Sequence, residues 1–167
     1  RGRHIFALDA EEDAGEHRRG AVGRKLQDEM TRLVFETADR DRTLFQSLLE
    51  TRQIHGAGKL ALDDIQRKPI TIGRLVAGSF VLGSKITRGT LRGERVGLML
   101  PNTKAAAVAF FGLQAYGRVP ALLNYTTGAK AMAAACVAAE IGLIVTSRKF
   151  VEMARLGEVV AELSARA

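Results

Sequence analysis

The sequence has very few residues suited to metal binding or disulfide formation: one cysteine, Cys136, and three histidines at positions 4, 17 and 55. One cysteine excludes an internal disulfide framework, and no spacing of these residues resembles a zinc or iron site. Cys136 lies in an alanine-rich run, residues 133–139, where a small buried thiol is a commoner role than a nucleophile or ligand. The sequence therefore predicts no metal site.

Long apolar runs are also missing. No stretch of about 18 uninterrupted apolar residues occurs, and no basic, apolar, small-residue signal opens the chain. These absences argue against a bilayer-spanning or secreted segment and favour a cytoplasmic setting. With 167 residues, of which 47% are hydrophobic, the chain can bury one ordinary core.

Aromatic residues are scarce, and the positive charge is unevenly placed. The nine aromatics are not interleaved with basic clusters, and no zinc-finger or RNP-like signature appears, so nucleic acid is not expected as a partner. Residues 1–42 carry nine Lys/Arg against ten Asp/Glu, whereas residues 43–167 carry sixteen against eight. The basic second part favours an anionic partner such as a nucleotide, an acidic protein or phospholipid head groups, or else is a solvated face without a partner.

The composition divides the chain near residue 42. Residues 1–23 are charged and dotted with glycine, without a sustained apolar period, and are expected to form a linker. A helix is predicted from about Val22 to between Phe35 and Asp39, because apolar residues recur there at helical spacing. We therefore expect a linker and helix over residues 1–42 and a folded domain over residues 43–167.

Short apolar runs alternate with longer helical patterns in the second part. Residues 43–53 predict a helix with Thr43 as its N-cap, followed by a hairpin of residues 60–62 and 69–72 and a helix over residues 73–86. The strands and helices expected after that are residues 95–100 (strand), 105–116 (helix), 119–123 (strand), 129–139 (helix), 143–146 (strand) and 150–163 (helix). Short connections between alternating strands and helices predict an α/β fold in which the three strands are adjacent and parallel.

Three apparent motifs do not fit their context. His4 and Asp9 have the His-x4-Asp spacing of glycerolipid acyltransferases, but they lie in a charged terminal segment. Residues 56–61 have the spacing of a dinucleotide fingerprint, yet they follow a helix and precede a strand, the reverse of the required order. Residues 78–85 approach a phosphate loop, but Ser84 and Lys85 stand in the wrong order within a helical pattern. We interpret these segments as a chance match, a helix stop and a helix face.

Four segments, in order, resemble the acyl-CoA synthetase, luciferase and peptide-synthetase adenylation superfamily. They are residues 70–75 (ITIGRL), 93–102 (GERVGLMLPN), 110–124 (FFGLQAYGRVPALLN) and 138–147 (AAEIGLIVTS). The resemblance covers roughly residues 42–167. It implies the parallel-sheet N-terminal subdomain of an adenylate-forming (AMP-binding) synthetase, preceded by a helical or linker segment.

Three further segments look like the synthetase half of bifunctional 2-acylglycerophosphoethanolamine acyltransferase/acyl-acyl carrier protein synthetases. These are residues 35–39 (FETAD), 41–45 (DRTLF) and 67–69 (RKP). In that family a phospholipid acyltransferase domain precedes the adenylating domain. The resemblance therefore implies that residues 1–42 connect the two domains of a parent protein at the cytoplasmic side of the inner membrane.

The reaction that the resemblance implies is the conversion of fatty acid and ATP to acyl-AMP, followed by acyl transfer to the thiol of acyl carrier protein or CoA. The phosphate loop, the magnesium-binding carboxylate, the ribose-binding aspartate and the lid lysine of that family have no match in these residues. ATP and Mg²⁺ are thus expected for the full-length parent and not for this chain, and no catalytic, cofactor-binding or metal residue is assigned. Asn102, Asn124 and Tyr125 follow predicted strands, where α/β folds place ligands, but capping and turn formation is the commoner role.

Two other functions stay open. The chain could be a small stand-alone nucleotide-binding domain, which a defined nucleotide affinity would support. It could instead be a non-catalytic basic module that docks an acidic carrier protein or a membrane surface, which salt-sensitive binding without nucleotide dependence would support. The docking candidates are the cations expected in turns and helix ends, Arg67, Lys68, Arg88, Arg92 and Arg118; Lys104 and Lys130 are expected only to solvate their helices.

Overall fold

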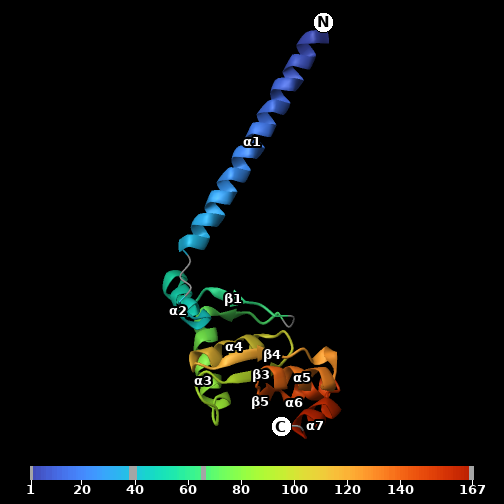
Figure 1. Cartoon of the computed structure of the whole chain (residues 1–167). Helices are drawn as coiled ribbons and strands as arrows, with labels where there is room; N and C mark the ends of the chain where they lie inside the picture. The colour runs from blue at the N-terminus through green and yellow to red at the C-terminus, as the bar shows by residue number, and fades with distance from the viewer. Residues whose placement is uncertain (1, 38–40, 65–66, 166–167) are drawn as a thin grey trace. The chain divides into compact units, whose positions relative to one another are not determined.

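A computed structural model of the chain describes residues 2–37, 41–64 and 67–165, with side chains described from residue 19 onward. The chain forms two compact units, Arg1–Asp41 and Arg42–Ala167. Figure 1 shows the first unit as a single helix and the second as a small sheet with helices around it.

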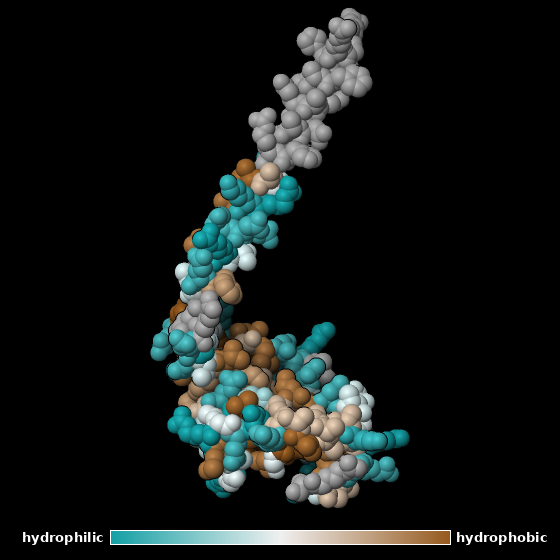
Figure 2. Space-filling view, in the orientation of Figure 1, coloured by the Kyte–Doolittle hydropathy of each residue, from teal (hydrophilic) through white to brown (hydrophobic). Residues whose placement is uncertain are grey.

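The first unit is one helix, α1 (Gly2–Thr37). Residues 2–23, which the sequence predicts as a linker, are part of this helix. The reason is intrinsic propensity: the segment is rich in alanine, glutamate and arginine and contains no proline, so a helix forms there without an apolar stripe. The side chains of His4 and Asp9 lie outside the described residues. Further along, the apolar side chains Val22, Leu26, Met30 and Leu33 are between 57% and 65% exposed. Figure 2 shows brown, hydrophobic patches along this part of the helix.

The second unit contains five strands and seven helical segments within the described residues. They are α2 (Leu44–His55), β1 (Leu60–Leu62), β2 (Ile70–Thr71), α3 (Ile72–Ile86), β3 (Arg95–Met99), α4 (Lys104–Ala115), β4 (Val119–Leu122), η1 (Tyr125–Thr127), α5 (Ala129–Ala138), β5 (Leu143–Thr146), α6 (Arg148–Met153) and α7 (Gly157–Ser164). The expected hairpin is present as an antiparallel pair of β1 and β2.

The main sheet has the strand order β4-β3-β5, and both pairings are parallel. The predicted α/β fold and its three adjacent parallel strands are thus confirmed. The chain steps from β3 to β4 on one side and then returns across β3 to β5. Because parallel crossovers are right-handed, steps in opposite directions place their helices on opposite faces of the sheet.

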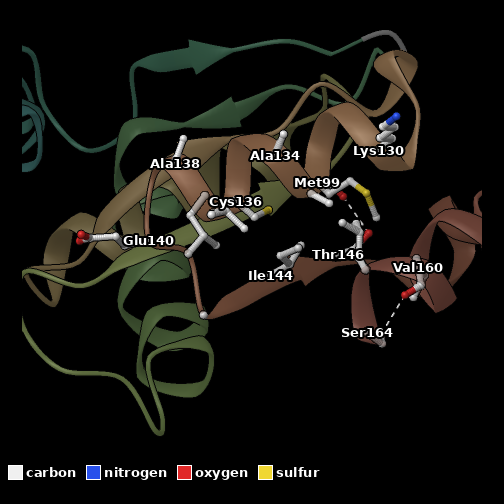
Figure 3. A pocket seen from close by; sticks show the side chains of 15 residues that line it. Met99, Lys130, Ala134, Cys136, Ala138, Glu140, Ile144, Thr146, Val160 and Ser164 are labelled. Carbon is white, nitrogen blue, oxygen red and sulfur yellow. Dashed lines mark hydrogen bonds between the residues drawn. The ribbon is translucent and has the colours of Figure 1, made fainter. Parts of the chain in front are cut away.

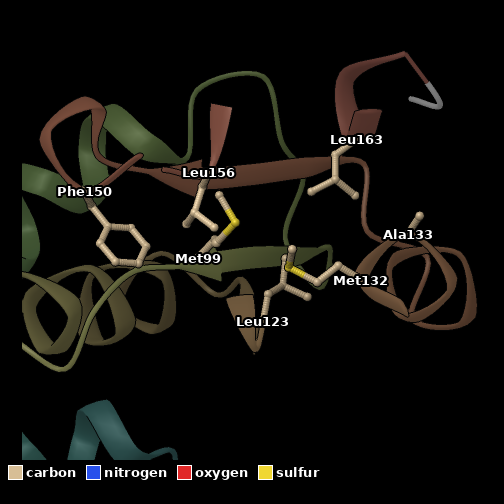
Figure 4. Close-up of a cluster of buried hydrophobic side chains, with 7 residues drawn as sticks. All are labelled: Met99, Leu123, Met132, Ala133, Phe150, Leu156 and Leu163. Atoms are coloured by element: carbon tan, nitrogen blue, oxygen red, sulfur yellow. The ribbon is translucent and has the colours of Figure 1, made fainter. Parts of the chain in front are cut away.

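Successive side chains of β3 belong to hydrophobic clusters on opposite faces of the sheet. Val96 and Leu98 pack with Ala109 and Leu113 of α4. Met99 belongs to a second cluster, drawn in Figure 4, that joins the sheet to α5, α6 and α7; its buried members are Met99, Leu123, Met132, Ala133, Phe150, Leu156 and Leu163. Successive side chains of a strand point to opposite faces, so one short strand anchors both helical layers.

Side-chain caps fix where the helices begin. Thr43 and Gln46 form a capping box at α2. The backbone amide of Gln46 donates to Thr43 Oγ1 at 3.2 Å, and the backbone amide of Thr43 donates to the side-chain oxygen Oε1 of Gln46 at 2.7 Å. The expected N-cap is therefore confirmed. α2 ends at Gly56, whose φ of 84° suits a residue without Cβ. The interpretation of residues 56–61 as a helix stop agrees with this geometry, and residues 78–85 lie within α3.

The predicted closing helix over residues 150–163 is two helices, α6 and α7, and the expectation of one helix is wrong. The break passes through Arg155, which has a φ of 54°, to Leu156, which is buried in the cluster of Figure 4. A left-handed residue ends α6 and turns Leu156 inward. Burial of one leucine side chain thus overrides the helical periodicity of the sequence.

Glycines allow α3 and α4 to pack at close range. A Cβ added at Gly83 would lie 2.6 Å from the carbonyl oxygen of Gly112 and 2.7 Å from the ring of Tyr116. A Cβ added at Gly112 would lie 3.0 Å from the carbonyl oxygen of Ser79. The Ser79 hydroxyl is buried and donates to the Leu75 carbonyl at 2.8 Å. The layer that covers this face of the sheet depends on two residues that have no side chain.

Candidate functional site

The carboxyl ends of the three parallel strands are where α/β folds place ligands, and two polar residues there, Asn124 and Tyr125, take part in local structure. Asn124 Oδ1 accepts from the amide of Thr126 at 3.0 Å and from its hydroxyl at 2.8 Å, which caps η1. The ring of Tyr125 packs edge-on against Phe150, with ring centroids 4.9 Å apart. Asn102 is exposed. None of these three residues lines either of the two hollows described below.

The amino end of α4, which follows β3, is approached by a carboxylate from the β1–β2 hairpin. The Lys104 amide donates to Asp64 Oδ2 at 3.5 Å, while Thr103, the N-cap residue, makes no side-chain cap. Lys104 Nζ donates to the carbonyl of Lys68 at 3.3 Å. Lys104 therefore holds the hairpin loop against α4, and the expectation that it only solvates its helix is wrong. A carboxylate at this position disfavours a phosphate at the same helix end.

The cations proposed for docking divide into two groups. Arg67, Lys68, Arg88 and Arg92 are exposed, as expected. Arg118 is not free, because its guanidinium is half-buried and donates to the carbonyls of Tyr116, Thr87 and Thr90 and to the hydroxyl of Thr90. The expectation of a solvent-facing Arg118 is therefore wrong. The planar fork of guanidinium donors suits several carbonyls at once, and these carbonyls lie where α3 and α4 end.

An apolar groove of about 850 Å³ lies on the second unit. Its walls come from α5, β5, the turn between them and α7 (Figure 3). Ile144, Val137 and Val160 line it, and Lys130 and Glu140 lie toward opposite ends. Sequence reasoning missed this groove, because the alternating pattern predicts the elements but not which of their faces remain uncovered.

Cys136 also lines the groove and is half-buried. Burial raises the pKa of its thiol above the ordinary value. The thiol is then less ionised at neutral pH than a free cysteine, which disfavours nucleophilic chemistry. This agrees with the expected role as a small packing residue.

A second hollow of about 390 Å³ lies at the amino ends of β3 and β5. It is lined by Arg88, Thr90, Glu94, Arg95 and Glu140 among others. Arg95 and Glu140 form an ion pair across it, and both side chains are exposed. Because these two opposite charges already pair with each other, the hollow exerts little net electrostatic attraction on a charged ligand.

Among the residues that the structure describes, no group of three or more histidine, cysteine, aspartate or glutamate side chains could hold a metal ion. The helix end that follows β3 receives the carboxylate of Asp64, and the side chain of Asn124 is engaged in a cap. Within the same residues, no helix is long and apolar enough to cross a membrane.

A parallel sheet with helices on both faces and irregular turns at its carboxyl ends defines the class of this domain as open-sheet α/β. Residues 52–166 match the family model described as AMP-binding enzyme, and the chain belongs to this family. The resemblance to adenylate-forming synthetases predicted from the sequence is thereby confirmed at the level of the family.

Solved structures of adenylate-forming ligases are similar to the second unit. A benzoate CoA ligase from Burkholderia xenovorans LB400 has a TM-score of 0.62 and 23% identity, covering 74% of this chain and 24% of its own. ATP-bound MatB from Rhodopseudomonas palustris has a TM-score of 0.61 and 21% identity, covering 74% of this chain and 23% of its own. The N-terminal domain of FACL13 from Mycobacterium tuberculosis has a TM-score of 0.62 and 17% identity, covering 75% of this chain and 31% of its own.

These likenesses establish the fold, which corresponds to the N-terminal subdomain of adenylate-forming enzymes as the sequence predicts. The chain spans between 23% and 31% of the length of these three structures.

Proposed function

We propose that this chain is the front part of a fatty acyl-adenylate-forming ligase that transfers its acyl group to acyl carrier protein or CoA. The observation that supports this most is the AMP-binding match over residues 52–166, together with a parallel sheet of the same topology as predicted. Segments 35–39, 41–45 and 67–69 further favour a parent in which a lysophospholipid acyltransferase domain precedes the ligase and associates with the inner membrane.

Within the proposed ligase, residues 42–167 act as scaffold. No Ser/Thr/Gly-rich loop followed by Pro-Lys-Gly occurs in the sequence, so we assign the handling of ATP and Mg²⁺ to other parts of the parent. Two observations on the described residues support this assignment: no group of three or more histidine, cysteine, aspartate or glutamate side chains could hold a metal ion, and the amino end of α4 receives the carboxylate of Asp64. No step of the reaction is therefore assigned to a residue of this chain.

The proposal predicts that this chain alone releases no pyrophosphate from ATP in the presence of fatty acid and Mg²⁺. The complete parent protein, measured under the same conditions, should release pyrophosphate in a fatty-acid-dependent way. A coupled pyrophosphate assay with a no-enzyme blank checks both. Turnover by the chain alone would contradict its scaffold role, and an inactive parent would contradict the proposed ligase.

A non-catalytic docking role is the second candidate, and the exposed cations favour it. Arg88 and Arg92 lie on the segment that leads into β3, at the amino end of the sheet, and both side chains are exposed. Carrier proteins of the acyl-transfer type are expected to be acidic. A basic surface raises the rate of encounter with an acidic partner and contributes less to the final affinity.

The double charge reversal Arg88→Glu and Arg92→Glu in the parent protein is expected to slow association with acyl carrier protein by roughly 10-fold at low salt. Folding should survive, because exposed charges contribute little to stability. The matched control is Arg148→Glu with Lys149→Glu, an equal change of charge at the start of α6, near the opposite end of the sheet. Stopped-flow association rates that fall equally in both variants, or in neither, would remove this surface as the docking site.

A further inference from the structure

The middle of the chain carries positive charge almost without opposite charge. Residues 65–139 contain ten lysine and arginine residues and a single acidic residue, Glu94. Helix α3 lies within this stretch, and neither α3 nor α4, which packs along it, contains an acidic residue. The one acidic residue of α2 is Glu50, which forms an ion pair with Arg42. The cations of α3 therefore remain unneutralised by the helices that surround them.

The exposed side of α3 combines two of these cations with apolar residues. Arg74, Ala77, Val81 and Lys85 are all exposed and follow one another at spacings of three and four residues, which places them along one side of the helix. Val81 is 63% exposed, and it lies between Arg74 and Lys85, which are roughly 16 Å apart along the helix axis. Neither cation forms an ion pair with a residue that the structure describes. We call these four residues, together with the neighbouring Phe80, the α3 surface.

Phe80 is an exposed aromatic residue that the fold holds in place. It is 43% exposed, yet its ring packs edge-on against the rings of Phe45 and Tyr116, with centroids 5.2 Å and 6.4 Å away. The Tyr116 hydroxyl also donates to the carbonyl of Phe80 at 3.1 Å. An aromatic side chain that is already ordered loses little conformational entropy when a partner covers it.

The chemistry of the α3 surface fits an acidic protein. Protein interfaces typically have an apolar, aromatic centre and a polar rim, and the rim of the α3 surface is positive. A small anion would make no use of the apolar centre formed by Phe80 and Val81. Arg74 and Lys85 are also too far apart to hold one small anion between them.

We infer that the α3 surface docks acyl carrier protein, through an acidic face of the carrier that has apolar residues at its centre. The inference rests on the proposed function, in which the acyl group passes to this carrier. It adds an apolar anchor, Phe80 and Val81, to the cations proposed above. The cations raise the rate of encounter, and the apolar centre sets the lifetime of the complex.

Val81→Asp in the complete parent protein tests the apolar centre. The dissociation constant for acyl carrier protein is expected to rise roughly 10-fold, because a carboxylate then meets an acidic partner at the centre of the contact. Met153→Asp is the matched control, since Met153 on α6 is 72% exposed and the change of charge is the same. Surface plasmon resonance on immobilised carrier measures both variants, and circular dichroism checks that both fold. Equal dissociation constants in the two variants would overturn the inference.

Arg74→Glu with Lys85→Glu tests the cations independently of the apolar centre. The association rate should fall roughly 10-fold at low salt, while the dissociation rate changes far less. The difference from the wild-type parent should vanish near 1 M salt, where the Debye length is about 3 Å. Arg148→Glu with Lys149→Glu is again the control of equal charge. A loss that is as large in this control, or that persists at high salt, would overturn the inference.

Further measurements separate other partners and the proposed activity. A wild-type parent that light scattering shows to be a dimer, and that Val81→Asp makes monomeric, would overturn the inference in favour of a second copy. Binding to phosphatidylglycerol vesicles that the same substitution abolishes would overturn it in favour of a membrane surface. Fatty-acid-dependent pyrophosphate release by the wild-type parent reports the ligase activity separately. An active parent whose carrier binding ignores these substitutions overturns this inference alone, whereas carrier binding through the α3 surface in an inactive parent overturns only the proposed activity.

Discussion

Gly83→Ala is expected to lower the free energy of unfolding of residues 42–167 by about 3 kcal/mol, a large effect for a single added methyl group. The new Cβ would lie 2.6 Å from the backbone oxygen of Gly112 and 2.7 Å from the ring of Tyr116. A backbone oxygen cannot rotate away as a side chain can, so α3 and α4 must separate. The gain in helix propensity from glycine to alanine, about 1 kcal/mol, offsets only part of this cost.

Gly78→Ala on the same helix is the matched control. Its added Cβ would meet Val108 Cγ1 at 3.2 Å, which is the end of a side chain and can shift. We expect a change within about 1 kcal/mol of the wild-type chain. Urea unfolding followed by circular dichroism measures both variants. Equal stability of the two variants would show that the contact between Gly83 and Gly112 does not limit the helix spacing.

Arg118→Ala is expected to destabilise the same unit by about 2 kcal/mol. The substitution removes four hydrogen bonds and leaves the carbonyls of Thr87, Thr90 and Tyr116 without this donor. The side chain is half-buried, so water replaces part of what is lost. These carbonyls lie where α3 and α4 end, and the loss should loosen the connection from α3 to β3 first.

Arg118→Lys separates the geometry of the guanidinium from its charge. Lysine keeps the charge but cannot reach several acceptors with a planar fork, so we expect most of the loss to remain. Arg88→Ala, which removes an exposed cation from the same region, should change the free energy of unfolding by less than about 0.5 kcal/mol. The same urea unfolding measurement applies to all three variants. If Arg118→Lys is as stable as the wild-type chain, charge alone explains the role of this residue.

The main elements of the second unit are predictable from the sequence because each is short and bounded by a local signal. Thr43 caps α2 with its own hydroxyl, and Gly56 ends that helix with a positive φ. The apolar runs that become β3, β4 and β5 are separated by short helical connections, α4 in the first case and η1 with α5 in the second, so their parallel arrangement follows from chain connectivity. The family resemblance depends on these same segments, and for that reason the amino-acid sequence is enough to reveal it.

The sequence predictions fail where contacts with distant parts of the chain decide the position of a side chain. Residues 150–163 have the periodicity of one helix, but burial of Leu156 divides them. Arg118 has the local context of a surface turn, but the ends of two helices surround its guanidinium. In residues 2–23, the first part of α1, the reverse holds: helix propensity alone forms the helix, and no sustained apolar period predicts it.

The sequence by itself determined the α/β class, the order of the elements and the family, because hydrophobic period, caps and turn glycines act over a few residues. Only the tertiary structure decided which faces of those elements are covered. It revealed the close approach of Gly83 to Gly112, the half-burial of Arg118 and the uncovered groove along α5 and β5. Each of these depends on the distance between segments far apart in the chain, and local sequence patterns carry no information about that distance.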